Sequence, residues 1–309
     1  MTMKLFPENT NFDFIGKSKY AIALSIAISI MTVYLWVSKG DSKYGIDYKG
    51  GTEIVIKLSE NTESQIVREA LEAGGVKDAT VQSFEAGSQE YSIKVSGSED
   101  TTKNSILAAL KAKFADKVSI ERTDVVGPTI GEELRAKALI AIIFGLIGIM
   151  IYVSVRFEFA FAVGALGSLI HDVFVCTGIY LLAGREINAS TLAATLAIVG
   201  YSVNDTIVIF DRVREEILKT KKFEIVPLIN KCINITFSRT MITGLLTLFS
   251  ALALLIYGGG SISDLSFYMV VGIITGGYST IFIASPIVIA FDRWSRSREA
   301  ARGAISARS

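Results

Sequence analysis

Long apolar runs alternate with polar segments along the chain. Six apolar runs cover residues 20–37, 138–155, 159–183, 189–210, 241–257 and 267–291. About 20 apolar residues are enough for one helix to cross the hydrocarbon core of a bilayer. Half of the 309 residues are hydrophobic, and the mean hydropathy is +0.46. The pattern predicts an α-helical polytopic membrane protein with six transmembrane helices.

Positive charge is unevenly shared between the polar segments, and this predicts the orientation. Cations gather before the first run, between the second and third, after the fourth and after the sixth: Lys17, Lys19, Arg156, Arg212, Arg214, Lys219, Lys221, Lys222, Lys231, Arg239, Arg293, Arg296, Arg298, Arg302 and Arg308. The other short connections hold only Arg185 with Glu186, and Asp264. The positive-inside rule predicts that residues 1–19 and the tail, 292–309, are cytoplasmic.

The long polar segment, residues 38–137, is then extracytoplasmic, with linkers at its ends. Apolar or alternating stretches predict strands at 52–58, 79–84, 91–95 and 118–125. One helix is predicted over 62–73, with a capping box of Thr62 and Gln65, and a second begins near Asp100. This order, β-α-β-β-α-β, predicts a small α+β domain of the ferredoxin-like type.

Asp205 is the strongest candidate for chemistry. It interrupts an apolar stretch, where a carboxylate at the centre of a membrane helix costs on the order of 2.5–3.5 kcal/mol. Its functional interpretation is a proton carrier, because burial disfavours the charged form of a carboxyl and a nearby cation favours it. Its structural interpretation is a carboxylate that hydrogen-bonds neighbouring helices.

Arg239 is the candidate cation for Asp205. It stands at the start of the fifth run, at a depth compatible with Asp205 near the end of the fourth, so the sequence favours a salt bridge. The alternative is an interfacial anchor that reaches the lipid headgroups. Asn204 and Ser202 flank Asp205 and are candidate hydrogen-bond donors to its carboxylate.

His171 and Asp172 form an adjacent pair near the middle of the third run. The usual pKa of histidine, near 6.5, suits a proton relay. Neighbouring residues point about 100° apart on a helix, so the two need not share a face. Packing against another helix is the alternative interpretation.

Glycines mark both connections of the outer domain to the membrane. The entry, YGIDYKGG at 44–51, and the exit, VGPTIGEEL at 126–134, both indicate turns or linkers. The alternative interpretation of the entry segment is a simple tight turn before the first strand.

Several classes of function are excluded. The single histidine, His171, rules out multi-histidine metal motifs, and Cys176 and Cys232 do not form a disulfide framework. There is no P-loop or dinucleotide fingerprint, so no cofactor is expected and the chain is not expected to be an enzyme. Membrane topology explains the basic segment at 212–239, so no nucleic-acid partner is expected. That segment is also a candidate amphipathic helix on the lipid surface.

The segment GYSVNDTIVIFDRVRE at 200–215 resembles the signature of the SecF subunits of the SecD–SecF family, part of the RND superfamily. The GID-x-x-GG pattern is similar to the family's entry motif, at Gly45, Ile46, Asp47, Gly50 and Gly51. The exit segment with Gly127 and Pro128, the SRT triplet at Arg239 and the His171–Asp172 pair also resemble family motifs.

The resemblance implies one half of an RND-type transporter in a bacterial cytoplasmic (inner) membrane. It implies that SecD is the partner, that SecYEG with SecA forms the export channel, and that translocating preproteins are the cargo. It also implies proton conduction by Asp205 and Arg239, driven by the proton motive force. Two alternatives stay open from the residues alone: an RND-type exporter of small molecules, and a passive scaffold for other translocon subunits.

Overall fold

The computed structural model describes residues 11–60, 62–76, 79–83, 89–95, 99–219 and 223–306. Six helices in this part of the chain are long and apolar enough to cross a membrane, which confirms the predicted fold class. They are α1 Phe14–Ser38, α5 Pro128–Arg156, α6 Phe159–Leu182, α7 Ala189–Lys219, α8 Ile225–Tyr257, and the continuous run formed by α9 Gly260–Ser279, a π-helical turn Thr280–Ala284 and α10 Ser285–Ser306.

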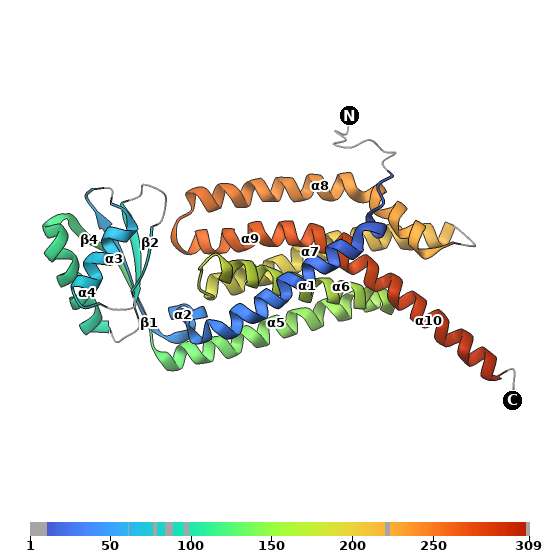
Figure 1. Ribbon diagram of the computed structural model, residues 1–309, viewed down its shortest axis with the longest axis horizontal. Helices are drawn as coiled ribbons and strands as arrows, with labels where there is room; N and C mark the ends of the chain where they lie inside the picture. The colour runs from blue at the N-terminus through green and yellow to red at the C-terminus, as the bar shows by residue number, and fades with distance from the viewer. Residues whose placement is uncertain are drawn as a thin grey trace.

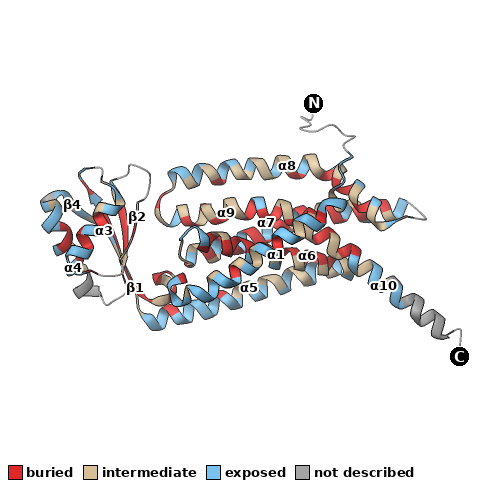
Figure 2. Cartoon of the chain, viewed as in Figure 1, coloured by how far each residue is buried: buried red, intermediate tan, exposed pale blue. Residues whose placement is uncertain are grey.

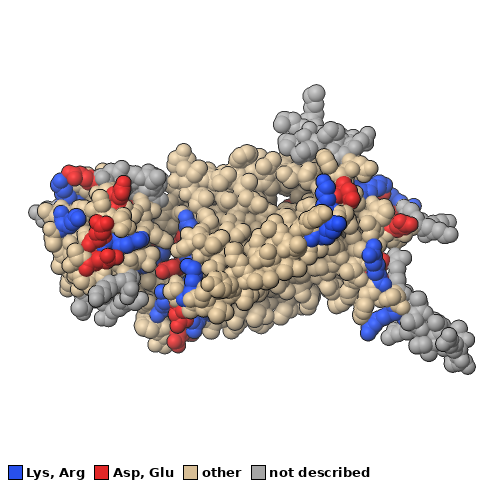
Figure 3. Space-filling view, in the orientation of Figure 1, with Lys and Arg blue, Asp and Glu red and all other residues tan. Residues whose placement is uncertain are grey.

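The helices form one elongated bundle with the small domain at one end, called here the domain end (Figure 1). α1 begins and α10 ends at the opposite end, called here the terminal end. Charged side chains gather at both ends and on the small domain, and an uncharged band lies between them (Figure 3). Such a band is what the hydrocarbon core of a bilayer requires. The first ten residues of the predicted cytoplasmic segment lie outside the described part of the chain.

The helix α8 begins sixteen residues before the predicted fifth run, at Ile225 instead of 241. Asn230 and Asn234 lower the hydropathy of this stretch, but their amides bind the start of α1: Asn230 Oδ1 accepts from the Phe14 amide at 2.9 Å and Asn234 Oδ1 from the Phe12 amide at 2.9 Å. The surface-helix interpretation of this segment is therefore wrong. Its apolar side chains join the protein core instead: Leu228, Ile229, Cys232 and Ile233.

The centre of the bundle is formed by α6, α7 and α9, while α1, α5 and α8 expose most of their surface (Figure 2). Small residues allow α7 and α9 to approach closely. A Cβ atom added to Gly272 would lie 2.4 Å from the Ile198 side chain, and one added to Gly276 would lie 3.1 Å from the Ser202 Cβ. These glycines fix the separation of the two central helices.

The small domain holds β1 Gly51–Leu58, α3 Ser64–Ala73, β2 Thr80–Ser83, β3 Glu90–Val95, α4 Glu99–Phe114 and β4 Val118–Val126. Its described strands form an antiparallel sheet in the order β2-β3-β1-β4, and α3 and α4 pack together over its core. The ferredoxin-like prediction is confirmed. Phe84, predicted at the end of the second strand, lies outside the described residues.

The predicted capping box of α3 is wrong. Glu63 occupies the N-cap position and no side chain caps the helix. Thr62 is held instead by Tyr91 of β3, whose hydroxyl accepts from the Thr62 amide at 3.2 Å and donates to the Thr62 carbonyl. A tertiary contact has replaced the local one that the spacing indicated.

We expect Gly272→Ala to destabilise the protein and Gly277→Ala, on the same helix, to be tolerated. The first substitution drives a methyl group into the buried Ile198, and overpacking costs about 1–3 kcal/mol. No atom lies within 4 Å of a Cβ added to Gly277. Thermal unfolding of the two purified variants would measure the difference, and equal melting temperatures would contradict the close approach of α7 and α9.

Candidate functional site

Asp172 lies fully buried at the centre of the bundle and is hydrogen-bonded on both carboxylate oxygens. Oδ2 accepts from the Ser202 hydroxyl of α7 at 2.6 Å and from the Ser279 hydroxyl of α9 at 2.9 Å. Oδ1 lies 3.1 Å from Nδ1 of His171. The residue therefore joins three helices, and the adjacent His171–Asp172 pair does meet, which the spacing alone left open.

The His171 ring extends this network to α1. Its Nε2 lies 2.9 Å from the Ser25 hydroxyl, and that hydroxyl lies 3.0 Å from the Tyr278 hydroxyl. The Tyr278 ring stacks on His171 with centroids 6.1 Å apart. A continuous chain of exchangeable protons thus runs from α1 to α7 and α9. Ser25 and Tyr278 were not predicted, because a single hydroxyl in an apolar run carries no sequence signal of its partner.

The π-helical turn Thr280–Ala284 follows Ser279 directly. Pro286 lies just beyond it and has no amide hydrogen to donate to the preceding turn. Thr280 in the turn lies 3.0 Å, hydroxyl to hydroxyl, from Thr206 of α7. Such turns are frequent at functional sites, and this one lies where Ser279 contacts Asp172 of α6 and Thr280 contacts Thr206 of α7.

Asp205 is also buried, at 4% exposure, but its surroundings differ from those of Asp172. No described residue forms a hydrogen bond or an ion pair with its carboxylate. Arg239 is the described cation whose charge acts on it, without a direct salt bridge. The predicted donors are not its partners: Ser202 binds Asp172, and Asn204 faces the exposed side of α7.

Two hydroxyl groups on these helices are buried without a hydrogen-bond partner among the described residues, those of Tyr201 on α7 and Thr240 on α8. Unsatisfied buried polar groups in native proteins are usually bound to water. Tyr201 lies four residues before Asp205 and Thr240 directly follows Arg239, so both helices offer polar positions to which water can bind. Thr243 donates to the Arg239 carbonyl of its own helix at 3.1 Å.

Helix geometry orders these groups by depth. Asp172 lies ten residues, about 15 Å, from the last residue of α6 at the domain end. Asp205 lies sixteen residues, about 24 Å, from the first residue of α7. Arg239 lies eighteen residues, about 27 Å, from the last residue of α8. Asp205 and Arg239 thus share a level nearer the terminal end, as the sequence predicted.

The glycine-rich entry motif forms a joint between the small domain and the bundle. After a 3-10 turn, Gly40–Lys43, the short helix α2, Ile46–Lys49, leads into β1. The Gly45 amide donates to the Ile187 carbonyl at 2.9 Å, and the Asp47 carboxylate accepts from the Ala189 amide at 2.8 Å. Asp47 therefore caps the start of α7, where a negative charge is favoured. The motif is more than the simple turn of the alternative interpretation.

Gly50 and Gly51 complete the joint with φ angles of +79° and +149°, which favour glycine. A Cβ atom on Gly50 would lie 2.7 Å from the Cα of Pro128, the first residue of α5. Gly51 pairs with Val126 across β1 and β4, and Gly127 is the N-cap of α5. The domain therefore enters and leaves the bundle at one place, between adjacent strands. Ile46 is buried there, and burial raises the pKa of Tyr48 to about 12.

Two loop charges of the sequence analysis form a partly buried ion pair in the structure. Arg185 binds Asp264 at 2.6 Å, and the Asn188 side chain donates to the other Asp264 oxygen at 2.7 Å. Asp264 lies inside α9, not in a loop, because that helix begins at Gly260. This cluster ties the α6–α7 connection to α9 beside the joint.

Glu186, next to Arg185, contacts the small domain. The Thr80 hydroxyl of β2 donates to its carboxylate at 3.4 Å. Burial raises the pKa of Glu186 above its usual range, and this effect exceeds the opposing influence of Lys49, Lys94 and Thr80. A domain docked on Glu186 therefore binds more protons than an undocked one.

We expect docking of the small domain to strengthen as the pH falls through the raised pKa of Glu186 and to weaken above it. Spin labels at the exposed Glu121 and Ser261 would report the distance distribution between domain and bundle. It should narrow at low pH in the unmodified chain and stay narrow at both pH values in Glu186→Gln. Glu133→Gln, an exposed position, is the control; a pH response that survives Glu186→Gln would contradict the assignment.

A six-helix bundle with buried carboxylates and an inserted ferredoxin-like domain defines a polytopic membrane protein with a small α+β domain outside the bundle. The family model "Protein export membrane protein SecD/SecF, C-terminal" matches residues 106–294. A SecF protein translocase subunit of Calditerrivibrio nitroreducens is 39% identical over 293 residues, covering 93% of this chain and 96% of the relative. The SecF subunit of Thermodesulfovibrio yellowstonii is 38% identical over 285 residues, covering 91% and 94%.

A crystal structure of SecDF, a translocon-associated membrane protein from Thermus thermophilus, superposes with a TM-score of 0.83 at 34% identity. It covers 94% of this chain and 40% of the SecDF chain, so this chain spans about two fifths of that protein. The chain belongs to the SecF family of protein translocase subunits. It is a transport subunit of a bacterial membrane and not an enzyme.

Proposed function

We propose that this SecF-family subunit works with a SecD partner and uses the proton motive force to promote late export of preproteins from SecYEG and SecA. The observation that carries the proposal is Asp205: a buried carboxyl in a membrane helix with no hydrogen-bond or ion-pair partner among the described residues. A structural carboxylate is expected to be satisfied, as Asp172 is. Asp205 is arranged as a group that changes its charge.

Proton binding at Asp205 follows from its surroundings. A charged carboxylate in the membrane is costly, and Arg239 at the same depth offsets part of that cost without a fixed salt bridge. Helix movements that change the separation from Arg239 would shift the balance between the charged and neutral forms. One proton that falls through 100 mV releases about 2.3 kcal/mol, which is the energy available for each such step.

Asp172 and His171 supply a second stage toward the domain end. Ser202 lies three residues before Asp205, close to one turn of α7, and donates to Asp172. The chain Ser202–Asp172–His171–Ser25 then passes through the bundle centre. We assign the His171–Asp172 pair as the relay on the domain side and Asp205 as the site that receives the proton from it.

The exposed polar face of α7 and α8 supports a partner subunit. Asn204 and Arg239 are both exposed, although each lies within a long apolar helix. Lipid contact at these positions would be costly, whereas a second membrane subunit would cover them. The solved SecDF chain is more than twice as long as this chain, and we assign the covering surface to SecD.

The orientation follows from charge. The terminal end carries the cations of α7, α8 and α10, so the positive-inside rule places both termini in the cytoplasm and the small domain outside (Figure 3). Asp205 then receives protons that have crossed from the domain side. The small domain is the element that contacts the emerging preprotein, and the joint at Gly50, Gly51 and Gly127 transmits movement to it.

We expect Asp205→Asn to abolish the gradient-dependent part of export and to leave assembly intact, because the amide cannot bind and release a proton. The measurement is preprotein transport into vesicles that hold SecYEG, SecA and the complete SecD–SecF pair, with and without a proton gradient. Asp211→Asn is the matched control, since Asp211 lies on the same helix but is exposed and paired with Arg156 at 3.6 Å.

Full gradient stimulation in Asp205→Asn would overturn the proposal. Export that fails equally with and without a gradient, together with loss of the assembled pair, would instead favour the scaffold interpretation, in which Asp205 is structural. Replacement of the proton gradient by a sodium gradient in the same vesicles identifies the coupling ion.

A further inference from the structure

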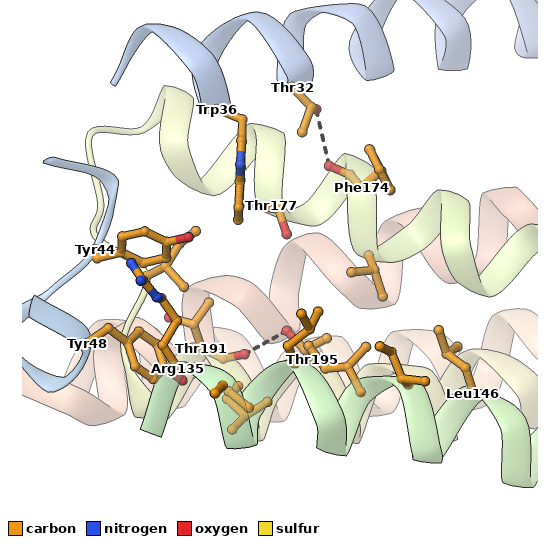
Figure 4. Close-up of a pocket in the computed structure, with 18 of the residues that line it drawn as sticks. Thr32, Trp36, Tyr44, Tyr48, Arg135, Leu146, Phe174, Thr177, Thr191 and Thr195 are labelled. Carbon is orange, nitrogen blue, oxygen red and sulfur yellow. Dashed lines mark hydrogen bonds between the residues drawn. The ribbon is translucent and has the colours of Figure 1, made fainter. Parts of the chain in front are cut away.

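We propose that a cavity between α1 and α5 binds one acyl chain of an anionic phospholipid from the leaflet at the domain end. The cavity has a volume of about 960 Å³ and lies between α1, α5, α6 and α7 (Figure 4). That volume is at the upper end of the range found for ligand pockets and is far larger than a packing void.

The wall of the cavity is apolar, because most of its side chains are hydrocarbon and its threonine hydroxyl groups are already hydrogen-bonded. Side chains of α5 and α6 dominate it, including Leu139, Ile142, Leu146 and Val173. The hydroxyl groups of its four threonines already have protein partners: Thr32 binds the Phe174 carbonyl, Thr177 the Tyr268 hydroxyl, Thr191 the Asn188 side chain and Thr195 the Thr191 carbonyl. The wall therefore offers water few hydrogen-bonding groups, whereas it offers a hydrocarbon chain apolar contacts.

The depth of the cavity matches one leaflet. Arg135 lines its outer rim and Leu146 its inner end, eleven residues further along α5, which is about 16 Å of helix. Half of a bilayer's hydrocarbon core is about 15 Å thick. A helix of a partner subunit would cross both leaflets, so a cavity of this depth fits the tail of a single lipid better.

The rim of the cavity has the chemistry of a lipid headgroup region. Trp36, Tyr44 and Tyr48 line it, and aromatic residues are enriched at this level of membrane proteins. The Arg135 guanidinium lies 5.1 Å from the Tyr44 ring centroid and has no ion-pair partner among the described residues. Its N–H groups remain free to bind a phosphate.

Charge at the rim favours an anionic lipid. Lys43 lies between the rings of Trp36 and Tyr44, at 4.8 and 4.7 Å from their centroids, and donates one hydrogen bond to the Gly40 carbonyl. Lys43 does not itself line the cavity, but with Arg135 it gives two cations at the rim against the one acid of the lining, Glu132. The carboxylate of Asp47, next to Tyr48, accepts from the Ala189 amide at 2.8 Å. Glu133 does not alter this sum, since it is paired with Lys137 at 2.8 Å.

The test uses Trp36 as the reporter, since it lines the cavity and the chain has only one other tryptophan, Trp294. The full chain carrying Trp294→Phe is placed in vesicles of phosphatidylcholine with a fixed fraction of brominated phosphatidylglycerol or brominated phosphatidylcholine. We expect the brominated phosphatidylglycerol to quench Trp36 with about tenfold higher apparent affinity, which corresponds to about 1.4 kcal/mol.

Four variants distinguish a specific lipid site from general contact with lipid. Arg135→Ala should remove the preference for phosphatidylglycerol, while Arg135→Lys should keep much of it because the charge remains. The pair Ile142→Phe and Val173→Phe should fill the cavity and reduce quenching by both lipids. Ile140→Phe, on the same helix but outside the cavity lining, should leave quenching unchanged.

Equal quenching by the two lipids in the unmodified chain would overturn the proposal, as would a preference that survives Arg135→Ala. The same measurement on the assembled pair with its SecD partner, with the partner's tryptophans replaced, tests the other occupant. Loss of quenching by both lipids on assembly would show that a partner helix covers the cavity and would also overturn the lipid assignment.

Discussion

The structure depends on the need to satisfy one fully buried carboxylate. Asp172 sits where α6, α7 and α9 meet, and its oxygens are bound by Ser202, Ser279 and His171. These bonds require α7 and α9 to lie close enough for hydroxyl groups to reach a side chain on α6. The glycines of α9 permit that approach, and the π-helical turn after Ser279 turns two hydroxyl groups toward α6 and α7. An unpaired carboxylate here would cost several kcal/mol, so the packing of the central helices and the polar network stabilise each other.

The sequence predicted what depends on local pattern and missed what depends on tertiary contact. Six apolar runs and the strand–helix order of the small domain carried enough periodicity to define the fold class. The start of α8 was missed because Asn230 and Asn234 resemble loop residues until their partners on α1 are known. Asp205 and Arg239 stood out as charges in apolar helices, whereas Ser25, Tyr278 and Ser279 did not, because hydroxyl groups are common in such helices. The role of Asp264 was hidden for the same reason: a single acid near a helix end gives no sign of its partner Arg185 in the α6–α7 connection.

The entry motif shows how a short segment with two adjacent glycines can serve two elements at once. Asp47 caps α7, the helix that carries Asp205, and Gly50 and Gly51 start β1, the central strand of the small domain. The two elements are therefore linked through four residues of backbone, with no long linker between them. Gly127 closes the same joint from β4. A small rotation of α7 about its axis would displace Asp47 through its hydrogen bond to the Ala189 amide. The adjacent strands β1 and β4 would then move together as one body.

In the proposed coupling the two buried carboxylates have different roles, because they differ in the number of hydrogen-bond partners. Asp172 has a complete set of partners, so its network is stiff and favours one arrangement of the central helices. Asp205 has none among the described residues, so its charge state responds to any change at α8 or at a covering subunit. In the function that we propose, a proton that binds Asp205 alters the balance of charge with Arg239, and Ser202, one turn away on the same helix, carries that change to Asp172. The stiff network then passes it through α7 to Asp47 and the joint. Such an arrangement needs one group whose charge changes and one rigid network that transmits the change. Helix α7 carries the first, Asp205, and joins the second through Ser202.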